Sequence, residues 1–320
     1  MADTRFTLTH RFLLAAIVVA VASLTACGGS SDSTSPDDGN GPPVVDNGST
    51  DNGSTDNGST DNGGADNGAV DDSVLTGGSA DCFNEAMYRT GSTWTIKTRT
   101  TASSTLYPAT TSEYSEQATV KGATNFDGHA VTEIEYSAPG DDNKSWEYTA
   151  IADGKLITYG YKNLYAESGD VSTARFVPPM EFPLSMVPNE TYKFGPVSLE
   201  MDLPPSSADM AEPIENITTS NIIYLGQETI TVPAGTFVTC KGHEVTENKS
   251  VTNVNTPAGA MSITATTVTD SYSWTVAEGP YRGLLVQSIG DTAVTTSPGA
   301  GGAIEHSFDS QATELSANFK

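Results

Sequence analysis

Three cysteine thiols offer the most specific chemistry in this sequence, because a thiol can be acylated, oxidised to a disulfide or bound to a metal. They are Cys27, Cys82 and Cys240. No combination of Cys and His has the spacing of a zinc site. The sequence therefore predicts no metal site and no cofactor, and it separates Cys27, which follows an apolar run, from an even pair of cysteines further along the chain.

The residues before Cys27 have the pattern of an export signal. Arg5 and Arg11 precede a mostly apolar run over residues 13–24. A run of this length is too short to cross a bilayer comfortably, and small residues end it. A basic start, a short apolar run and small residues together predict a signal peptide over residues 1–26 rather than a membrane-spanning helix.

Leu24-Thr25-Ala26-Cys27 resembles the lipobox of bacterial lipoproteins, in which the final Cys is acylated. The resemblance implies diacylglycerol on the Cys27 thiol, cleavage before Cys27, and usually a third acyl chain, such as palmitate, on the new N-terminus. Two or three such chains are enough for stable anchoring in a membrane. Lipoproteins kept at the inner membrane commonly have Asp after the Cys, so Gly28 favours the outer membrane, on either of its faces.

Residues 27–79 are expected to form the lipidated Cys and a disordered tether. Residues 28–79 contain ten Asp and no Lys, Arg or aromatic residue, and Asp-Asn-Gly-Ser-Thr occurs three times in succession over 46–60. Such a segment cannot bury enough apolar surface to offset the entropy of ordering it. Asp at every fifth position of a flexible chain also does not supply the ligand cage that calcium requires.

Net charge argues against nucleic acid as a partner. The formal charge is -25, and more than half of it lies outside the tether. An acidic domain repels the phosphate backbone. The membrane, reached through the lipid anchor, is the partner that the sequence does predict.

Residues 80–320 are predicted to form one all-β domain. Alternating segments rich in Thr, Val, Ile, Tyr and Trp indicate strands, and no long stretch has helical periodicity. Because strands follow strands directly, we expect a large curved antiparallel sheet, in the form of a half-barrel or a barrel. A short helical turn, capped by Asp81, should open the domain. The clear strands are 94–97, 130–136, 146–150, 156–159, 221–225, 262–268, 271–276 and 284–287. Residues 201–220 and 291–303 are predicted to form long loops.

The sequence predicts one hairpin in detail. Pro233 suits the second position of a turn, and Gly235 suits a following bulge. We expect Val232 to pair with Thr236, which places Cys240 on the same face as Ile230 and Val232. Cys240 would then point into the core, where Cys82 could reach it. A disulfide between them and two unpaired thiols both remain open at this point.

The hairpin Val232-Pro233-Ala234-Gly235-Thr236-Phe237 resembles a signature of uncharacterised bacterial envelope proteins, many with signal peptides and some lipoproteins. Cys82-Phe83-Asn84, Gly91-Ser92-Thr93-Trp94 and 272–279 also resemble segments of these proteins. The resemblance implies a curved antiparallel sheet, similar to the half-barrels of periplasmic lipid carriers such as the lipoprotein-localisation factors. It supplies no activity and no catalytic residues.

Catalytic motifs are absent from the sequence. His243-Glu244-Val245-Thr246-Glu247 has Glu where a zinc protease motif needs its second His, and the segment alternates like a strand. We expect His243 to face solvent. No nucleophile elbow or phosphate-binding loop occurs, and the three His residues of the mature chain, His129, His243 and His306, support no triad.

The sequence thus favours a membrane-anchored envelope lipoprotein without catalysis, which binds an apolar ligand or an envelope partner. A structural or adhesive surface protein and an unrecognised hydrolase are the alternatives. Strand aromatics could line a hydrophobic cup, although aromatic faces of strands are more often core. These aromatics are Trp94, Trp146, Tyr148, Tyr272 and Trp274.

Overall fold

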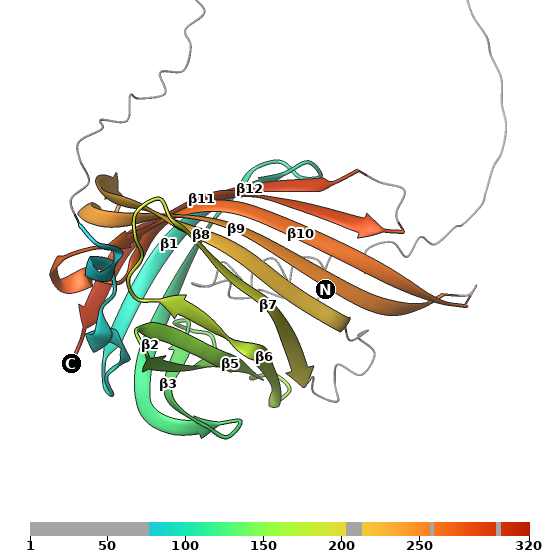
Figure 1. The fold of residues 1–320 in the computed structure, drawn as a ribbon, viewed down its shortest axis with the longest axis horizontal. Coiled ribbons are helices and arrows are strands. Elements are labelled where there is room, and N and C mark those ends of the chain that lie inside the picture. Colours follow the sequence, from blue (N-terminus) through green and yellow to red (C-terminus); the bar gives the residue numbers. More distant parts are fainter. Residues whose placement is uncertain (1–76, 203–212, 257–258, 299–301) are drawn as a thin grey trace, which may run out of the picture. The chain divides into compact units, whose positions relative to one another are not determined.

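The computed structural model describes residues 77–202, 213–256, 259–298 and 302–320. In this part of the chain, twelve antiparallel strands form a closed barrel in which each strand pairs with its neighbours in sequence and β12 pairs with β1 (Figure 1). The predicted all-β fold with a curved antiparallel sheet is confirmed, in its barrel form. The predicted signal peptide, Cys27 and nearly all of the tether lie outside the described residues.

Strands β8–β10 are the longest, with 20, 22 and 18 residues. Their bounds are β1 Thr93–Ser104, β2 Thr110–Phe126, β3 His129–Ser137, β4 Lys144–Ala152, β5 Lys155–Tyr165, β6 Asp170–Pro183, β7 Thr191–Asp202, β8 Pro213–Val232, β9 Gly235–Thr256, β10 Gly259–Val276, β11 Leu285–Ser297 and β12 Ile304–Asn318. The segments predicted as strands at 262–268 and 271–276 are therefore parts of one strand.

The two predicted loops are largely strand. β8 already begins at Pro213, and β11 continues to Ser297, so most of 213–220 and 291–297 belongs to the barrel. The reason is strand pairing, which composition could not reveal: Thr218 lies opposite Asn248, and Val294 lies opposite Thr267. Residues 203–212 and 299–301 of the predicted loops lie outside the described residues.

The β8–β9 hairpin has a tighter turn than predicted. Val232 pairs with Gly235, not with Thr236, so only Pro233 and Ala234 form the loop and no bulge follows. Ile230 consequently lies opposite Phe237. The one-residue difference places Cys240 on the face opposite to Ile230 and Val232, which corrects the predicted face. Cys240 is still buried, because a second set of side chains covers that face.

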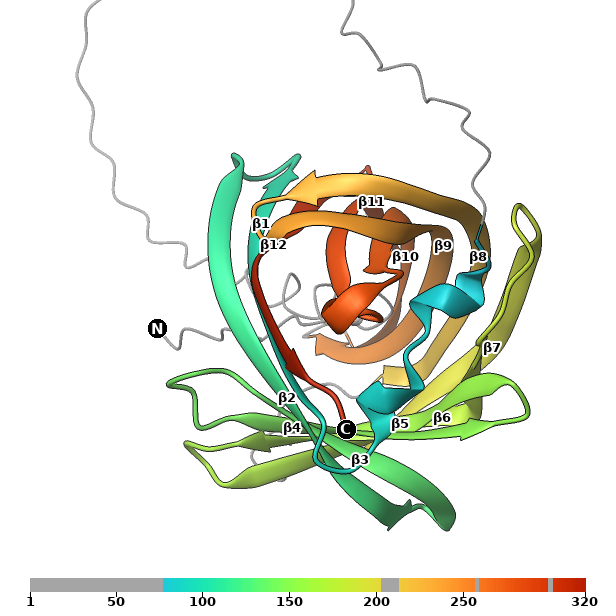
Figure 2. The same ribbon diagram turned by 90° about the vertical axis from the view of Figure 1, so that its left-hand side faces the viewer.

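Two short 3-10 helices precede the barrel, η2 (Ser79–Cys82) and η3 (Glu85–Tyr88). The predicted cap is wrong: Asp81 lies inside η2, and the side chain of Asn84 caps η3 by accepting a hydrogen bond from the Ala86 amide. η2 contacts β8 and β9, whereas η3 contacts β2. Figure 2 shows this segment lying across one end of the barrel. None of the helices in the described residues is long and apolar enough to span a bilayer.

Apolar packing is concentrated in separate clusters rather than in one core. The largest joins β1–β3 to the ends of β10 and β11, and it contains Trp94, Ile96, Ile134, Trp274, Val276 and Leu284 among others. A second cluster lies on β6 and β7. The third, Phe126, Val131 and Tyr148, lies on β2–β4. Between these clusters, long stretches of β8–β11 bury polar side chains instead.

Candidate functional site

One face of strands β8–β11 is buried although most of its side chains are polar, with Ile222, Ala265 and Val294 as apolar exceptions. On these strands the buried residues alternate with their neighbours, so they share one face of the sheet. The cross-strand pairs agree, since Thr218 lies opposite Asn248 and Asn248 lies opposite Thr267. We call this face the polar wall, made of Asn216, Thr218, Ser220, Glu244, Thr246, Asn248, Ser250, Thr267, Thr269, Ser271 and Ser288.

The polar wall faces the inside of the barrel. Its Ser, Thr and Asn side chains are buried, whereas the intervening Asn221, Glu247, Lys249 and Asp291 are exposed. In a closed barrel the two faces of a strand point to the interior and to solvent. This composition explains why 213–220 and 291–297 were predicted as loops, because Ser, Thr and Asn occupy positions where a strand normally places aliphatic residues.

The neighbouring strands line the interior with apolar side chains. Phe194 of β7 lies opposite Ser220, and Val197 lies opposite Thr218, so both share the face of the polar wall. We call this surface the apolar wall, made of Tyr161, Ala174, Phe176, Phe194, Val197 and Leu199 of β5–β7. The interior thus changes from apolar to polar between two adjacent strands, β7 and β8.

Part of the polar wall is held by hydrogen bonds within it. The Asn248 amide donates to Asn216 Oδ1 at 2.6 Å and to Thr218 Oγ1 at 3.0 Å. The Thr246 hydroxyl lies 3.1 Å from Ser220 Oγ, and both hydroxyls donate to the Glu244 carboxyl. These bonds fix the side chains across two strands, β8 and β9, so this part of the wall is preorganised.

Other buried polar atoms of the wall have no partner within the described part of the protein. They are Asn216 Nδ2, Thr267 Oγ1 and Ser288 Oγ. These residues are 3%, 1% and 1% exposed, respectively. A buried donor or acceptor without a partner costs about 1–3 kcal/mol, so such groups normally meet water or a ligand.

Glu244 is the acidic group of the polar wall. Desolvation by its surroundings raises the pKa of its carboxyl above the ordinary value, although the hydrogen bonds from Ser220 and Thr246 act in the opposite direction. A raised pKa favours the protonated carboxyl, which is neutral and can donate as well as accept a hydrogen bond.

A disulfide fastens the 3-10 segment to one end of the barrel. Cys82 of η2 and Cys240 of β9 are joined, with their Cα atoms 6.0 Å apart. Tyr224 lies beside this bond and donates to the Gly77 carbonyl at 2.9 Å. Desolvation raises the pKa of the Tyr224 hydroxyl, and the nearby Asp81 raises it further. The hydroxyl is therefore a stable donor that holds the chain as it enters the barrel.

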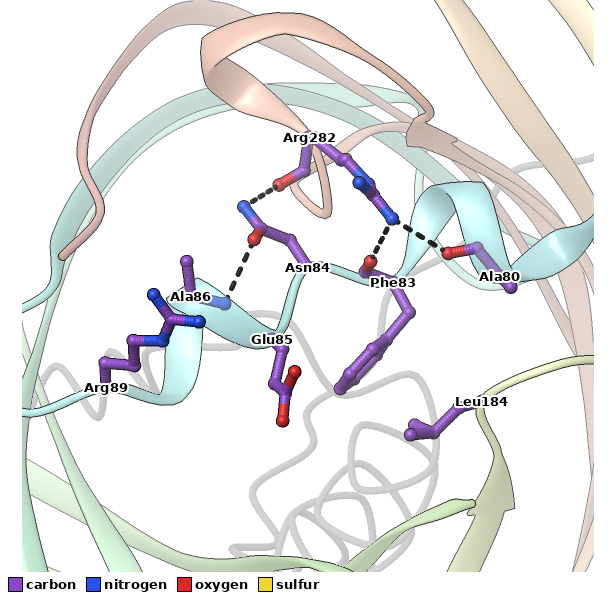
Figure 3. A pocket seen from close by; sticks show the side chains of 8 residues that line it. All are labelled: Ala80, Phe83, Asn84, Glu85, Ala86, Arg89, Leu184 and Arg282. Atoms are coloured by element: carbon purple, nitrogen blue, oxygen red, sulfur yellow. Dashed lines mark hydrogen bonds between the residues drawn. The ribbon is translucent and has the colours of Figure 1, made fainter.

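A pocket of about 470 Å³ lies beside this segment (Figure 3). Its basic groups are engaged in structural contacts: Arg282 donates to the carbonyls of Ala80, Asp81 and Phe83, and Arg89 donates to the Lys320 carbonyl. Asn84 in turn donates to the Arg282 carbonyl at 2.9 Å. The pocket therefore marks the joint between the 3-10 segment and the barrel, and the interior wall is the stronger candidate site. Its lining consists of Ala80, Phe83, Asn84, Glu85, Ala86, Arg89, Leu184 and Arg282.

His243 lies on the outer face of β9, as its position opposite Tyr272 shows. It is less open to solvent than predicted, because its ring stacks on Tyr272 and its Nε2 lies 2.8 Å from Asp270 Oδ1. Ser271 and Ser273 follow Asp270 in β10 but lie on the opposite face of the strand. They therefore complete no triad with His243 and Asp270. Within the described residues, no cluster of three or more His, Cys, Asp or Glu residues could hold a metal ion.

The five aromatic residues considered from the sequence do not meet in one cup. Trp94 and Trp274 belong to the largest cluster, whereas Trp146 and Tyr148 belong to the cluster on β2–β4. Tyr272 remains 38% exposed on the outer face. Four of the five are therefore packed in the protein, and the interior walls are built from residues that sequence reasoning did not single out. Their only sequence signal was the alternation of Ser, Thr and Asn along β8–β10.

No protein-family model matches the chain, and neither does any curated protein sequence. Distant structural matches exist among solved proteins. A predicted exported protein with a YmcC-like fold from Bacteroides fragilis is 13% identical, with a TM-score of 0.35, over 71% of this chain and 96% of that protein. A predicted lipoprotein from Parabacteroides distasonis is 14% identical, with a TM-score of 0.32, over 72% and 96%. Values this low support no statement about the function of this chain.

Proposed function

We propose that this protein is an exported, lipid-anchored envelope protein whose barrel binds an amphipathic ligand without catalysis. The observation that carries the proposal is the division of the barrel interior into an apolar wall on β5–β7 and a polar wall on β8–β11. A ligand with one apolar and one hydrogen-bonding part matches both surfaces. Such a ligand could also satisfy the unpartnered atoms of Asn216, Thr267 and Ser288.

The number of strands in the barrel supports an interior wide enough for a ligand. Eight strands give an interior that side chains fill or that holds one small ligand, and the diameter grows with the number of strands. The described residues form twelve strands, and the polar wall contributes mostly small side chains. Small side chains on a wide barrel leave more interior volume than large aliphatic ones would.

Export and anchoring are supported by the sequence before the barrel. The apolar run and Leu24-Thr25-Ala26-Cys27 favour acylation of Cys27, and Gly28 favours the outer membrane. The disulfide between Cys82 and Cys240 fits an oxidising compartment. Mass spectrometry of the mature N-terminus tests this part. A diacylglyceryl-modified Cys27 is expected, and a retained Met1 or an unmodified thiol at Cys27 would contradict it.

Ligand binding is tested on the whole chain purified from the cell envelope. Extraction with organic solvent followed by mass spectrometry is expected to release an amphiphile close to one per protein, whereas the covalent chains on Cys27 stay with the protein. A second acylated lipoprotein, purified in parallel, controls for adhering membrane lipid. Equal amounts of the same lipids from both proteins would count against a binding interior.

A further inference from the structure

The polar wall carries hydrogen-bonding groups but no cation. β8, β10 and β11 contain no Lys or Arg, and the two basic residues of β9 are Lys241 and Lys249. Both face away from the polar wall, since Lys241 pairs with Trp274 and Lys249 with Thr266, one residue out of register with the wall. Lys193 of β7 also lies on the outer face, opposite Asn221.

This distribution bears directly on the ligand. A phosphate taken out of water needs Lys, Arg or several amide donors to offset its lost hydration. The polar wall would present a phosphate with hydroxyls, two Asn side chains and the Glu244 carboxyl, which repels it when ionised. A hydroxyl-bearing group, in contrast, both donates and accepts, and it can match Ser, Thr and Asn without any charge.

The wall is also built to hold such a group. Asn216 Nδ2, Thr267 Oγ1 and Ser288 Oγ are more than nine-tenths buried and lie on the interior face without partners among the described residues. They come from β8, β10 and β11, so they span most of the wall. The hydrogen bonds from Asn248 to Asn216 and Thr218 hold the first of these groups in place.

We propose that the polar wall selects an uncharged, hydroxyl-rich group, such as a sugar, and discriminates against phosphate. The inference rests on the proposed function and specifies the polar part of its ligand. The adjoining apolar wall accepts an alkyl chain, because Phe194 and Val197 lie opposite Ser220 and Thr218. A neutral glycolipid is the ligand class that fits both walls.

The experiment compares head groups on one alkyl chain. The full mature chain with Cys27→Ser, exported behind a cleavable signal so that no acyl chain competes, is titrated by calorimetry below the micelle concentration of each probe. The probes are octyl glucoside, octyl phosphate, octyltrimethylammonium, octanol and methyl glucoside. We expect octyl glucoside to bind at least tenfold more tightly than octyl phosphate and octyltrimethylammonium. Octanol and methyl glucoside, which each match one wall, should both be weaker than octyl glucoside.

Variants locate the effect on the wall. Thr267→Val should lower octyl glucoside affinity about fivefold, since it removes one hydrogen bond to the ligand. It should not change octanol affinity. Thr219→Val, an exposed position on the outer face of β8, is the matched control and should have no effect. Urea midpoints close to that of the parent chain verify that each variant is folded.

The outcomes separate the two proposals. Equal binding of all charged and neutral octyl probes would overturn head-group selection and leave the amphiphile-binding barrel intact. Tighter binding of octyl phosphate or octyltrimethylammonium would overturn it as well. If none of the octyl compounds binds, amphiphile binding itself fails. Methyl glucoside binding as tightly as octyl glucoside would assign the site to a free saccharide.

Discussion

The two interior walls of this barrel both contain buried side chains but differ in what this burial contributes to stability. Phe176 and Leu199 on the apolar wall are 6% and 7% exposed, and Asn248 and Thr267 on the polar wall are 1% exposed. Burial of an aliphatic or aromatic side chain stabilises a fold by about 1.5–3 kcal/mol, whereas a buried hydroxyl contributes only if it is hydrogen-bonded. Burial of the apolar wall therefore contributes more to stability than burial of the polar wall.

The disulfide provides the largest test of this difference, because it ties a polar-wall strand to the 3-10 segment. Cys82 and Cys240 are separated by 158 residues, and closing a loop of that length stabilises a fold by about 5 kcal/mol in the chain-entropy treatment. Cys82→Ser combined with Cys240→Ser should lower the free energy of unfolding in urea by up to this amount. Hydrogen exchange should speed up more in β8 and β9 than in β6 and β7. A uniform increase over all strands would show that the polar wall does not depend on this bond.

A truncation on the apolar wall should have the next largest effect. Phe176→Ala removes a buried ring packed with Ala174 and Leu199, and we expect it to lower the free energy of unfolding by about 3–4 kcal/mol. Val177→Ala, at the neighbouring exposed position, is the control and should change stability by less than about 1 kcal/mol. Similar losses in both variants would mean that the β6 interior face is not a packed core.

Glu244 should make the polar wall sensitive to pH. Desolvation raises the pKa of its carboxyl in the folded state, so the unfolded chain releases this proton at a lower pH than the folded chain does. Stability is then fully present below the ordinary pKa of 4.5 and is lost as pH rises through the higher folded value. Glu244→Gln should remove this loss, and its urea midpoint should exceed that of the parent chain at neutral pH and approach it near pH 4.

The control for this pH dependence is Glu247→Gln, because Glu247 lies three residues away on the exposed outer face of β9. It should leave the pH profile of the urea midpoint unchanged. A pH profile of Glu244→Gln parallel to that of the parent chain would place the responsible group elsewhere.

The smallest expected effect compares two threonines of the polar wall. Thr267→Val removes an unpartnered hydroxyl and should leave the free energy of unfolding unchanged or raise it by about 1 kcal/mol. Thr246→Val removes a hydroxyl bonded to Ser220 and Glu244 and should lower it by about 1–2 kcal/mol. Equal losses would show that Thr267 is bonded within the fold, and the binding role of its hydroxyl would lose its support. Urea unfolding of both variants decides between these results.

Much of the fold was accessible from sequence because β-structure leaves a local signature. The alternation at 130–136 and 146–150 predicted β3 and β4, and both are strands. The register of the β8–β9 hairpin could not be predicted from the sequence with the same success. A two-residue and a three-residue loop both suit Pro233-Ala234-Gly235, and the choice between them moved Cys240 to the other face.

The candidate site was not predicted, since its residues belong to three separate hairpin pairings. Asn216, Thr267 and Ser288 are unremarkable polar residues in sequence, and 213–220 was read as loop because Asn, Thr and Ser are common in loops. Only the ladder pairs Asn216 with Ser250 and Thr267 with Asn248, and only closure of β12 onto β1 turns that face inward.

Sequence alone determined the all-β character, the antiparallel order and the expectation of an acylated N-terminus, because each depends on neighbouring residues along the chain. Tertiary structure alone decided that the sheet closes, that polar residues of β8–β11 are buried, and that Cys82 and Cys240 meet. These features depend on pairs of residues far apart in sequence, whose contact is set by strand register and by the closure of the barrel rather than by any local pattern.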